Sequence, residues 1–147
     1  GDGVRASKTV SGTTTTYVYD VNRSLPVVLD DGSRKYVWGL GLAYSVGTTG
    51  TVGVNYSDGL GSVRAIADAS AQVVQTYRYD PFGALESAAG GVTQPFQYTA
   101  EQRDGESGFY YLRARMYDPA IGRFLSRDSG LSALDLPGTL VRFVYVV

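Results

Sequence analysis

Short runs of alternating apolar and polar residues recur along the chain and predict β-strands. In residues 72–79 the alternation has the period of two that places successive side chains on opposite faces of a strand. One face carries Val73, Gln75, Tyr77 and Tyr79, and the other carries Val74, Thr76 and Arg78. Because neither face is purely apolar, we expect a sheet that forms one layer of a large shell.

Turn signals precede the aromatic strands. Glycine adopts positive φ without steric cost, and Asp-Gly or Gly-Gly pairs between alternating runs are typical of hairpin turns. The signals lie at Ser11-Gly12, Asp30-Asp31-Gly32, Gly47 to Gly50, Asp68-Ala69-Ser70, Gly90-Gly91 and 104–108. Their regular occurrence predicts a succession of β-hairpins.

An internal repeat organises these hairpins. Thr-Tyr-Val-Tyr-Asp at 16–20 returns as Thr-Tyr-Arg-Tyr-Asp at 76–80, and weaker echoes between and after them give a period of about 20 residues. The repeated positions are Tyr19, Asp20, Trp38, Tyr56, Asp58, Tyr79, Asp80, Tyr98, Tyr117 and Asp118. A unit of two strands and a turn cannot bury its own face, so neighbouring units must stack. The sequence therefore predicts an all-β fold of stacked repeats.

Composition narrows the chemistry. The 147 residues have a formal net charge of -1, so no basic field indicates nucleic-acid binding. The 19 glycines and 12 tyrosines suit short strands and tight turns, and the chain has no cysteine or histidine. A thiolate nucleophile, an imidazole base, a Ser-His-Asp triad and the usual zinc sites are therefore excluded. We expect no cofactor, and any catalysis would depend on carboxylates, lysine, hydroxyls or backbone groups.

The chain contains no run of about 18 apolar residues, so we expect no membrane span. It opens with Gly-Asp-Gly-Val-Arg, which differs from the basic and then apolar pattern of a signal peptide. It also lacks an initiator methionine. We interpret it as part of a longer protein.

Several motifs carry a resemblance to a known family. Residues 56–64 read Tyr-Ser-Asp-Gly-Leu-Gly-Ser-Val-Arg, and residues 79–83 read Tyr-Asp-Pro-Phe-Gly. A longer ordered run extends from Phe96-Gln97-Tyr98 through Asp104 and 108–119 to 122–128. Together they resemble the YD repeats and the repeat-associated core of Rhs proteins, which are shared with teneurins and with the C component of insecticidal toxin complexes. The resemblance covers roughly residues 1–128.

The resemblance implies an all-β ribbon of YD-repeat hairpins that forms part of a spiral shell around a C-terminal toxin, in a bacterial secreted or cell-surface protein. It divides the chain into YD-repeat hairpins at 1–95, a segment of the Rhs repeat-associated core at 96–128 and a degenerate or truncated tail at 129–147. We therefore expect a structural shell fragment rather than an enzyme. Its expected partners are other YD repeats of the parent chain.

The same family implies an aspartyl autoprotease that severs the cargo from the shell by means of two carboxylates. Arg115 and Asp128 match the basic and first acidic positions of the core. The family's second acid would lie beyond Val147, and the family reads Asp-Pro-x-Gly where this chain continues from Asp128 with Ser-Gly-Leu. Asp135 lacks that context and lies at the wrong spacing. A degraded remnant is expected, and an active self-cleaving protease is the alternative.

Three further interpretations concern partners. Acidic turns such as 30–32 and 104–106 contain the oxygen ligands that calcium prefers, but none has EF-hand spacing, so no metal site is assigned. Aromatic side chains, Trp38 among them, favour stacking on a cell-surface glycan unless they pack between strands. Open edge strands and the apolar tail at 143–147 favour self-association through strand addition.

A group of arginines near the end of the repeats is expected to stabilise the shell internally rather than to bind an external anion. The group comprises Arg113, Arg115, Arg123 and Arg127. Its expected partners are Asp118, Asp128 and buried carbonyl groups.

Overall fold

The computed structural model describes residues 3–127 and residue 145. Within them the regular structure consists of β-strands and one 3₁₀ turn, η1 (Tyr98–Ala100), and no α-helix occurs in this part of the chain. The all-β class predicted from the alternation is therefore confirmed.

Eight consecutive strands form the largest sheet. Each pairs antiparallel with the next along the chain, so the sheet is an uninterrupted meander. Its strands are β3 (Val18–Asp20), β4 (Val27–Asp30), β5 (Arg34–Trp38), β6 (Leu42–Gly47), β7 (Val52–Ser57), β8 (Val63–Ala67), β9 (Val73–Tyr79) and β10 (Leu85–Gly90).

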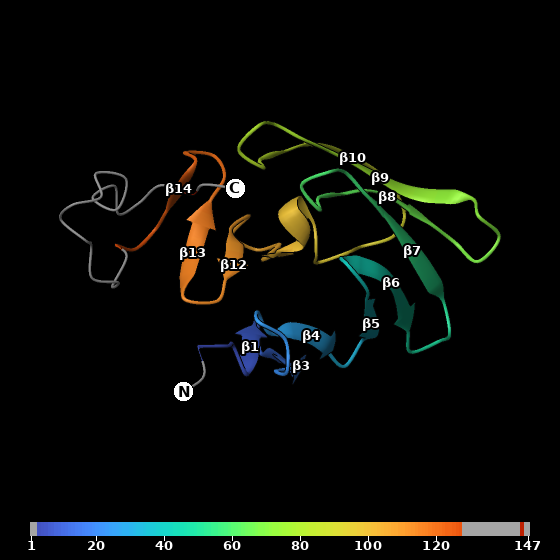
Figure 1. Ribbon diagram of the computed structural model, residues 1–147, viewed down its shortest axis with the longest axis horizontal. Helices are drawn as coiled ribbons and strands as arrows, with labels where there is room; N and C mark the ends of the chain where they lie inside the picture. Colours follow the sequence, from blue (N-terminus) through green and yellow to red (C-terminus); the bar gives the residue numbers. More distant parts are fainter. Residues whose placement is uncertain (1–2, 128–144, 146–147) are drawn as a thin grey trace.

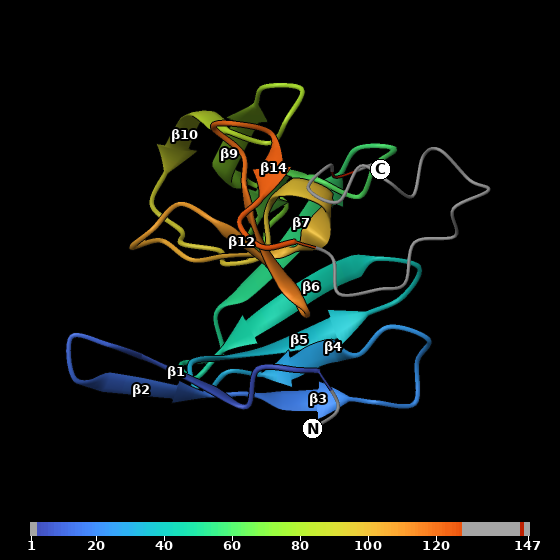
Figure 2. The same ribbon diagram turned by 90° about the vertical axis from the view of Figure 1, so that its left-hand side faces the viewer.

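Two smaller sheets accompany it. One is a hairpin of β1 (Ser7–Val10) and β2 (Thr13–Thr16). The other is a four-stranded meander of β11 (Gln102–Arg103), β12 (Tyr110–Leu112), β13 (Arg115–Asp118) and β14 (Arg123–Phe124). Figure 1 shows the large sheet curling from β3 and β4 at the bottom, past β7, to β10 at the top, with β12, β13 and β14 across its open side. In Figure 2 the β1–β2 hairpin projects to one side at the bottom.

Register shifts explain the curl of the large sheet. They occur where β4 pairs with β3, β6 with β5, β8 with β7, β9 with β8 and β10 with β9. Such a shift inserts an extra residue on one strand, which bends that strand and increases its right-handed twist. Repeated from pair to pair, the bends wrap the sheet around its own inner face.

Five of the six predicted turn signals connect neighbouring strands, and Gly90-Gly91 is the exception. There β10 ends and the chain leaves the sheet. Gly90 has a φ of +131°, and a Cβ at this position would lie 2.1 Å from the carbonyl oxygen of Val74. The glycine therefore lets the backbone pass close to β9 instead of turning into a hairpin.

Aromatic rings form two hydrophobic clusters inside the curl. In the larger cluster, six rings form a ladder with successive centroids 5.8 to 6.5 Å apart. The rings of this ladder belong to Tyr77, Tyr79, Tyr98, Tyr110, Tyr117 and Phe124. The smaller cluster contains Tyr17, Val28, Tyr36, Leu42 and Phe96. Since the ladder crosses residue 95, the two predicted segments 1–95 and 96–128 contribute to one core.

Candidate functional site

Three hairpin loops share one geometry, and each begins with an aspartate, at Asp58, Asp68 and Asp80. The aspartate N–H donates to the carbonyl four residues later, and the N–H three residues later donates to the aspartate carbonyl, at 2.9–3.1 Å. The aspartate Oδ1 accepts the N–H groups two and four residues later, at 2.8–3.0 Å. The aspartate of the Tyr79-Asp80 motif therefore ends a strand and closes its loop.

The fourth residue of each loop has left-handed backbone. Its φ is +85° at Gly61, +60° at Ala71 and +90° at Gly83. Glycine adopts this conformation freely, whereas alanine loses roughly 1–2 kcal/mol there. A Cβ at Gly83 would also lie 2.4 Å from Cδ1 of Tyr98. Glycine at this position is thus required twice, by conformation and by packing.

The 80–84 loop anchors three tyrosines of the ladder. Their hydroxyls donate to three consecutive loop carbonyls: Tyr98 to Pro81 at 2.9 Å, Tyr117 to Phe82 at 2.7 Å and Tyr110 to Gly83 at 3.0 Å. Burial raises the pKa of Tyr117 to about 12 and also raises the pKa of Tyr110. The loop formed by the Tyr-Asp-Pro-Phe-Gly motif therefore connects the four-stranded sheet to the large sheet through the hydroxyls of Tyr110 and Tyr117.

The repeated aromatic positions do not all occupy equivalent places. Three of them lie in the ladder: Tyr79, Tyr98 and Tyr117. Tyr56 instead lies on the outer face, with 53% of its surface exposed. Tyr56 lies two residues before its loop aspartate, Asp58, whereas Tyr79 lies directly before Asp80, and side chains one residue apart point to opposite faces of a strand. Tyr56 therefore does not share the inward packing of Tyr79.

The strand expected around Tyr98 is also absent from the described chain. Tyr98 begins η1, and the next two residues, Thr99 and Ala100, have φ values of +50° and +55°. These left-handed residues turn the chain sharply, which a strand does not allow. The tyrosine ring nevertheless reaches the ladder, 5.8 Å from the Tyr79 ring.

Tyr19 and Trp38 pack against the smaller cluster. The Tyr19 hydroxyl donates to the Arg5 carbonyl at 3.0 Å, and the Trp38 Nε1 donates to the Val28 carbonyl at 2.7 Å. The Trp38 ring also meets the Phe96 ring edge-on at 5.4 Å. Trp38 thus packs against its neighbours while remaining half-buried, and stacking of its ring on a glycan stays a prediction.

Asp20 and Asp118 organise shorter turns. Asp20 accepts the Asn22 N–H at 3.0 Å and pairs with Arg23 at 3.3 Å. Asp118 accepts the Ala120 N–H at 2.9 Å. Both aspartates therefore hold the backbone that follows a strand, as Asp58 and Asp80 do.

The predicted catalytic pair is described only in part. Arg115 lies over the Phe124 ring, with its Cζ 3.5 Å from the ring centroid. Asp128 lies outside the described residues, so its role and that of Arg115 stay a prediction. Arg113 departs from its expected partners, since its guanidinium pairs with Glu101 at 2.9 Å.

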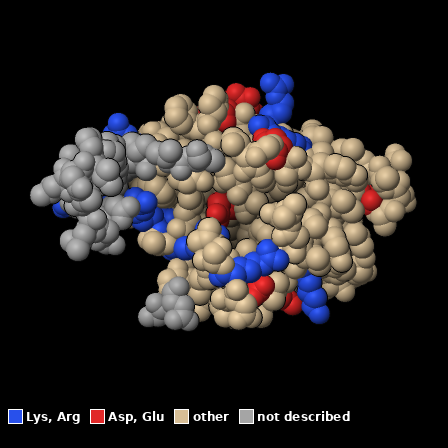
Figure 3. Space-filling view, in the orientation of Figure 1, with Lys and Arg blue, Asp and Glu red and all other residues tan. Residues whose placement is uncertain are grey.

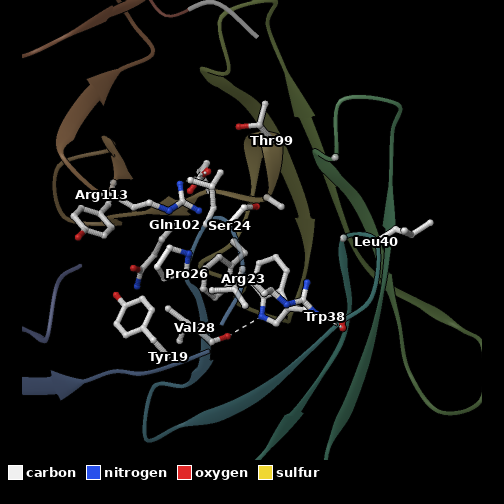
Figure 4. Close-up of a pocket in the computed structure, with 18 of the residues that line it drawn as sticks. Tyr19, Arg23, Ser24, Pro26, Val28, Trp38, Leu40, Thr99, Gln102 and Arg113 are labelled. Atoms are coloured by element: carbon white, nitrogen blue, oxygen red, sulfur yellow. Dashed lines mark hydrogen bonds and ion pairs between the residues drawn. The ribbon is translucent and has the colours of Figure 1, made fainter. Parts of the chain in front are cut away.

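The Glu101–Arg113 pair lines a pocket of about 340 Å³. Figure 4 shows Arg113 and Tyr19 at one end of it and Trp38 and Leu40 toward the other. Burial raises the pKa of Glu101, against the opposing effect of Arg113. Three residues that line the same pocket, Thr99, Ala100 and Arg113, have positive φ. Left-handed backbone and a partly buried ion pair in one pocket are typical of a binding site, although the sequence signals did not point to it.

A second ion-pair cluster joins distant parts of the described chain. Arg5 donates to both carboxylate oxygens of Asp104, at 2.8 and 3.0 Å, and Lys8 bridges Asp104 and Glu106 at 2.9 and 2.7 Å. The Arg5 guanidinium also lies 4.3 Å from the centroid of the Tyr111 ring. Although burial opposes it, hydrogen bonding to Arg5 and Lys8 lowers the pKa of Asp104. Sequence patterns missed this cluster because Arg5 and Asp104 are 99 positions apart.

The charged side chains occur in small groups of both signs on an otherwise mostly uncharged face (Figure 3). Among residues 3–127 and 145, no group of three acidic, histidine or cysteine side chains is placed to hold a metal ion. Within the same residues, no helix is long and apolar enough to cross a bilayer.

Residues 55–140 match the family model of the teneurin YD-shell. The chain belongs to the teneurin YD-shell family. Membership confirms the resemblance that the Tyr-Asp motifs and the ordered run after Phe96 carried. It also accounts for the antiparallel hairpins of this YD-shell chain, which form a curled sheet closed by an aromatic core.

Curated relatives of the YD-shell chain are much longer proteins. The tRNA3(Ser)-specific nuclease WapA of Bacillus spizizenii is 34% identical over 135 residues, which is 86% of this chain and 6% of the relative. The tRNA nuclease WapA of Bacillus subtilis is 33% identical over 138 residues, again 86% of this chain and 6% of the relative. The double-stranded DNA deaminase toxin A of Burkholderia cenocepacia is 30% identical over 78 residues, 50% of this chain and 6% of the relative. The YD-shell chain thus spans a small part of each.

Solved structures with the same fold are Tc toxin components. The Tc holotoxin pore of Photorhabdus luminescens superposes with a TM-score of 0.73 at 22% identity, over 99% of this chain and 8% of that one. The complex of TcdB2 and TccC3 without the hypervariable C-terminal region superposes with a TM-score of 0.66 at 21% identity, over 95% of this chain and 7% of that one. At these identities the likeness establishes the fold.

Proposed function

We propose that the chain is a structural segment of the wall of a YD shell in a bacterial secreted or cell-surface protein of the polymorphic toxin type. The observation that carries this proposal is the uninterrupted eight-stranded meander, which buries aromatic rings on one face and ends in open edges. A repetitive sheet of this kind extends by adding further hairpins. The nuclease and deaminase toxins among the relatives support a shell that encloses a toxin.

The edge strand β10 is where the wall continues or where copies of the chain associate. It pairs only with β9 among the described residues, and five of its six residues are exposed. Small residues such as Ala88 and Ala89 leave its backbone accessible. An accessible edge pairs with another strand unless charges or proline block it.

Size-exclusion chromatography of the wild-type chain and of an Ala88→Lys variant tests this proposal. We expect wild type to elute as a multimer and Ala88→Lys to shift toward monomer. Thr76→Lys is the matched control, since Thr76 is exposed but lies in β9 with paired strands on both sides. A wild-type monomer at high concentration would contradict association through this edge.

Intact mass spectrometry of the same samples tests the structural role against self-cleavage. We expect wild type and Asp128→Asn to keep their full mass. Cleavage at 131–136 in wild type but not in Asp128→Asn would instead identify an active aspartyl autoprotease and overturn the purely structural assignment.

A further inference from the structure

The pocket that contains the Glu101–Arg113 pair has a charged end and an apolar wall (Figure 4). Its volume of about 340 Å³ lies within the range of about 300–1,000 Å³ that is typical of small-ligand sites. The apolar wall includes Leu25, Val28, Trp38, Leu60 and Phe96. A lining of this kind can hold an apolar group of a ligand while the charged end fixes the orientation of that ligand.

The ion pair at the charged end uses only part of each charged group. Nη1 of Arg113 donates to Oε1 of Glu101 at 2.9 Å, although a guanidinium and a carboxylate can form two parallel bonds. Among the described residues, neither Oε2 of Glu101 nor Nη2 of Arg113 has a hydrogen-bond partner, and neither atom is fully buried. The pair therefore leaves one acceptor and one donor available to a ligand.

Both members of the pair also lack full compensation for their loss of water. Burial raises the pKa of Glu101 although the Arg113 guanidinium opposes this effect, so Arg113 alone does not stabilise the carboxylate fully. Nε of Arg113 is buried without an acceptor in the described part of the chain. A cationic group beside Glu101 and an anionic group beside Arg113 would each reduce this deficit.

The third charged side chain of the lining, Arg23, is already engaged by the chain itself. Its guanidinium donates to the carbonyls of Trp38 and Gly39 at 3.1 and 3.2 Å and pairs with Asp20 at 3.3 Å. These bonds hold the loop after β3 against the end of β5, so the wall on this side is formed before any ligand enters. The charges available to a ligand are therefore those of Glu101 and Arg113.

We propose that this pocket binds a free α-amino acid that has an apolar side chain. The α-ammonium group donates to Oε2 of Glu101, and the α-carboxylate accepts from Nη2 of Arg113. The apolar side chain packs against the wall at Val28, Trp38 and Phe96, where its removal from water favours binding. The inference does not depend on the proposed shell role.

Isothermal titration calorimetry of the wild-type chain with L-phenylalanine tests the proposal. Two comparison ligands each lack one charged group: phenethylamine has no carboxylate, and hydrocinnamate has no ammonium group. We expect L-phenylalanine to bind and each comparison ligand to bind at least about tenfold more weakly, as loss of one charge-assisted hydrogen bond implies. Because these titrations use the wild-type chain, they test the proposal even if a variant loses stability.

Two substitutions assign the charged groups to their partners. Glu101→Gln should weaken binding of L-phenylalanine by about tenfold or more and should not weaken binding of hydrocinnamate. Arg113→Gln should weaken binding of L-phenylalanine to a similar extent and should not weaken binding of phenethylamine. Thermal melting of each variant verifies that it is folded.

Glu86→Gln is the matched control, because Glu86 belongs to an exposed ion pair outside the pocket, 3.8 Å from Arg78. Its affinity for L-phenylalanine should equal that of wild type. Absence of binding to wild type, equal affinity for L-phenylalanine and either comparison ligand, or an equal loss in Glu86→Gln would overturn the proposal.

Discussion

Replacing Gly83 by alanine tests the repeated loop geometry more directly than any other single change. The residue has a φ of +90°, and the added Cβ would lie 2.4 Å from Cδ1 of Tyr98. The cost of the left-handed backbone and the cost of the contact with Tyr98 can be separated, because the related loop that begins at Asp58 offers controls. Gly61 has the same left-handed conformation with φ +85°, but the nearest atom to its Cβ would lie 3.9 Å away. Gly59 has neither positive φ nor any neighbour within 4 Å.

The expected losses in the free energy of unfolding follow from these distances. Gly59→Ala should change it by less than about 0.5 kcal/mol, as a surface substitution does. Gly61→Ala should cost roughly 1–2 kcal/mol, the penalty for an L-residue in left-handed backbone. Gly83→Ala adds an overpacking cost of roughly 1–3 kcal/mol, which makes about 2–5 kcal/mol in total.

Urea unfolding monitored by tryptophan fluorescence measures the three variants, since Trp38 is the single tryptophan of the chain. The midpoints should fall in the order Gly59→Ala, Gly61→Ala, Gly83→Ala, with unchanged slopes. Equal losses for Gly61→Ala and Gly83→Ala would refute the contact with the Tyr98 ring. A large loss for Gly59→Ala would refute the loop geometry itself.

The other predictions concern three polar side chains, those of Asp104, Tyr117 and Tyr19. Asp104→Asn should cost roughly 3 kcal/mol because it leaves two cations without their buried partner, whereas Glu106→Gln, at an exposed carboxylate, should stay within about 0.5 kcal/mol in the same urea assay. The pKa of Asp104 is lowered in the folded chain, so its ionised carboxylate contributes stability at pH values above the ordinary pKa of 3.8. This contribution should be lost as the pH falls through the lower pKa of the folded state. The difference in stability between wild type and Asp104→Asn should therefore shrink in acid. Tyr117→Phe removes the donor to the Phe82 carbonyl and should cost about 1–2 kcal/mol; an unchanged midpoint would contradict that bond. Burial raises the pKa of Tyr19 to about 12, so Tyr19 should still be protonated at about pH 11. The ultraviolet difference absorbance between wild type and Tyr19→Phe measures this ionisation. Ionisation of Tyr19 in the folded chain below about pH 11 would contradict its burial.

The elements that sequence predicted well are those fixed by local chemistry. Glycine and aspartate favour tight turns through their own conformational preferences, so five of the six predicted turn signals connect neighbouring strands. In the loops that begin at Asp58, Asp68 and Asp80, hydrogen bonds from the N–H groups two and four residues later to the aspartate close the turn. The family resemblance rested on the same loop motifs. Tyr56 lies on the outer face because one more residue separates it from its loop aspartate than separates Tyr79 from Asp80, a difference that a period of about 20 residues does not reveal.

The candidate sites were harder to predict because their residues meet only in the folded chain. Arg113 lies in the turn between β12 and β13 and pairs with Glu101, which precedes β11, and the left-handed backbone of Arg113 has no sequence signal. The ion-pair cluster joins Arg5 and Lys8 to acidic residues that lie 96 to 99 positions later in the chain. The alternation of apolar and polar residues indicates which face of its strand a residue occupies. It does not indicate which distant part of the chain packs against that face.

The meander topology has a consequence for the order in which the chain acquires structure. Every strand of the large sheet pairs with its sequence neighbour, so each pairing closes a short loop and becomes available as soon as its own residues have left the ribosome. The bond between Arg5 and Asp104 instead closes a loop of 99 positions, and the larger loss of chain entropy makes its formation slower. The large sheet can therefore form one hairpin at a time during synthesis. The ion pairs between the N-terminal hairpin and the acidic loop after β11 can form only after that loop has been synthesised.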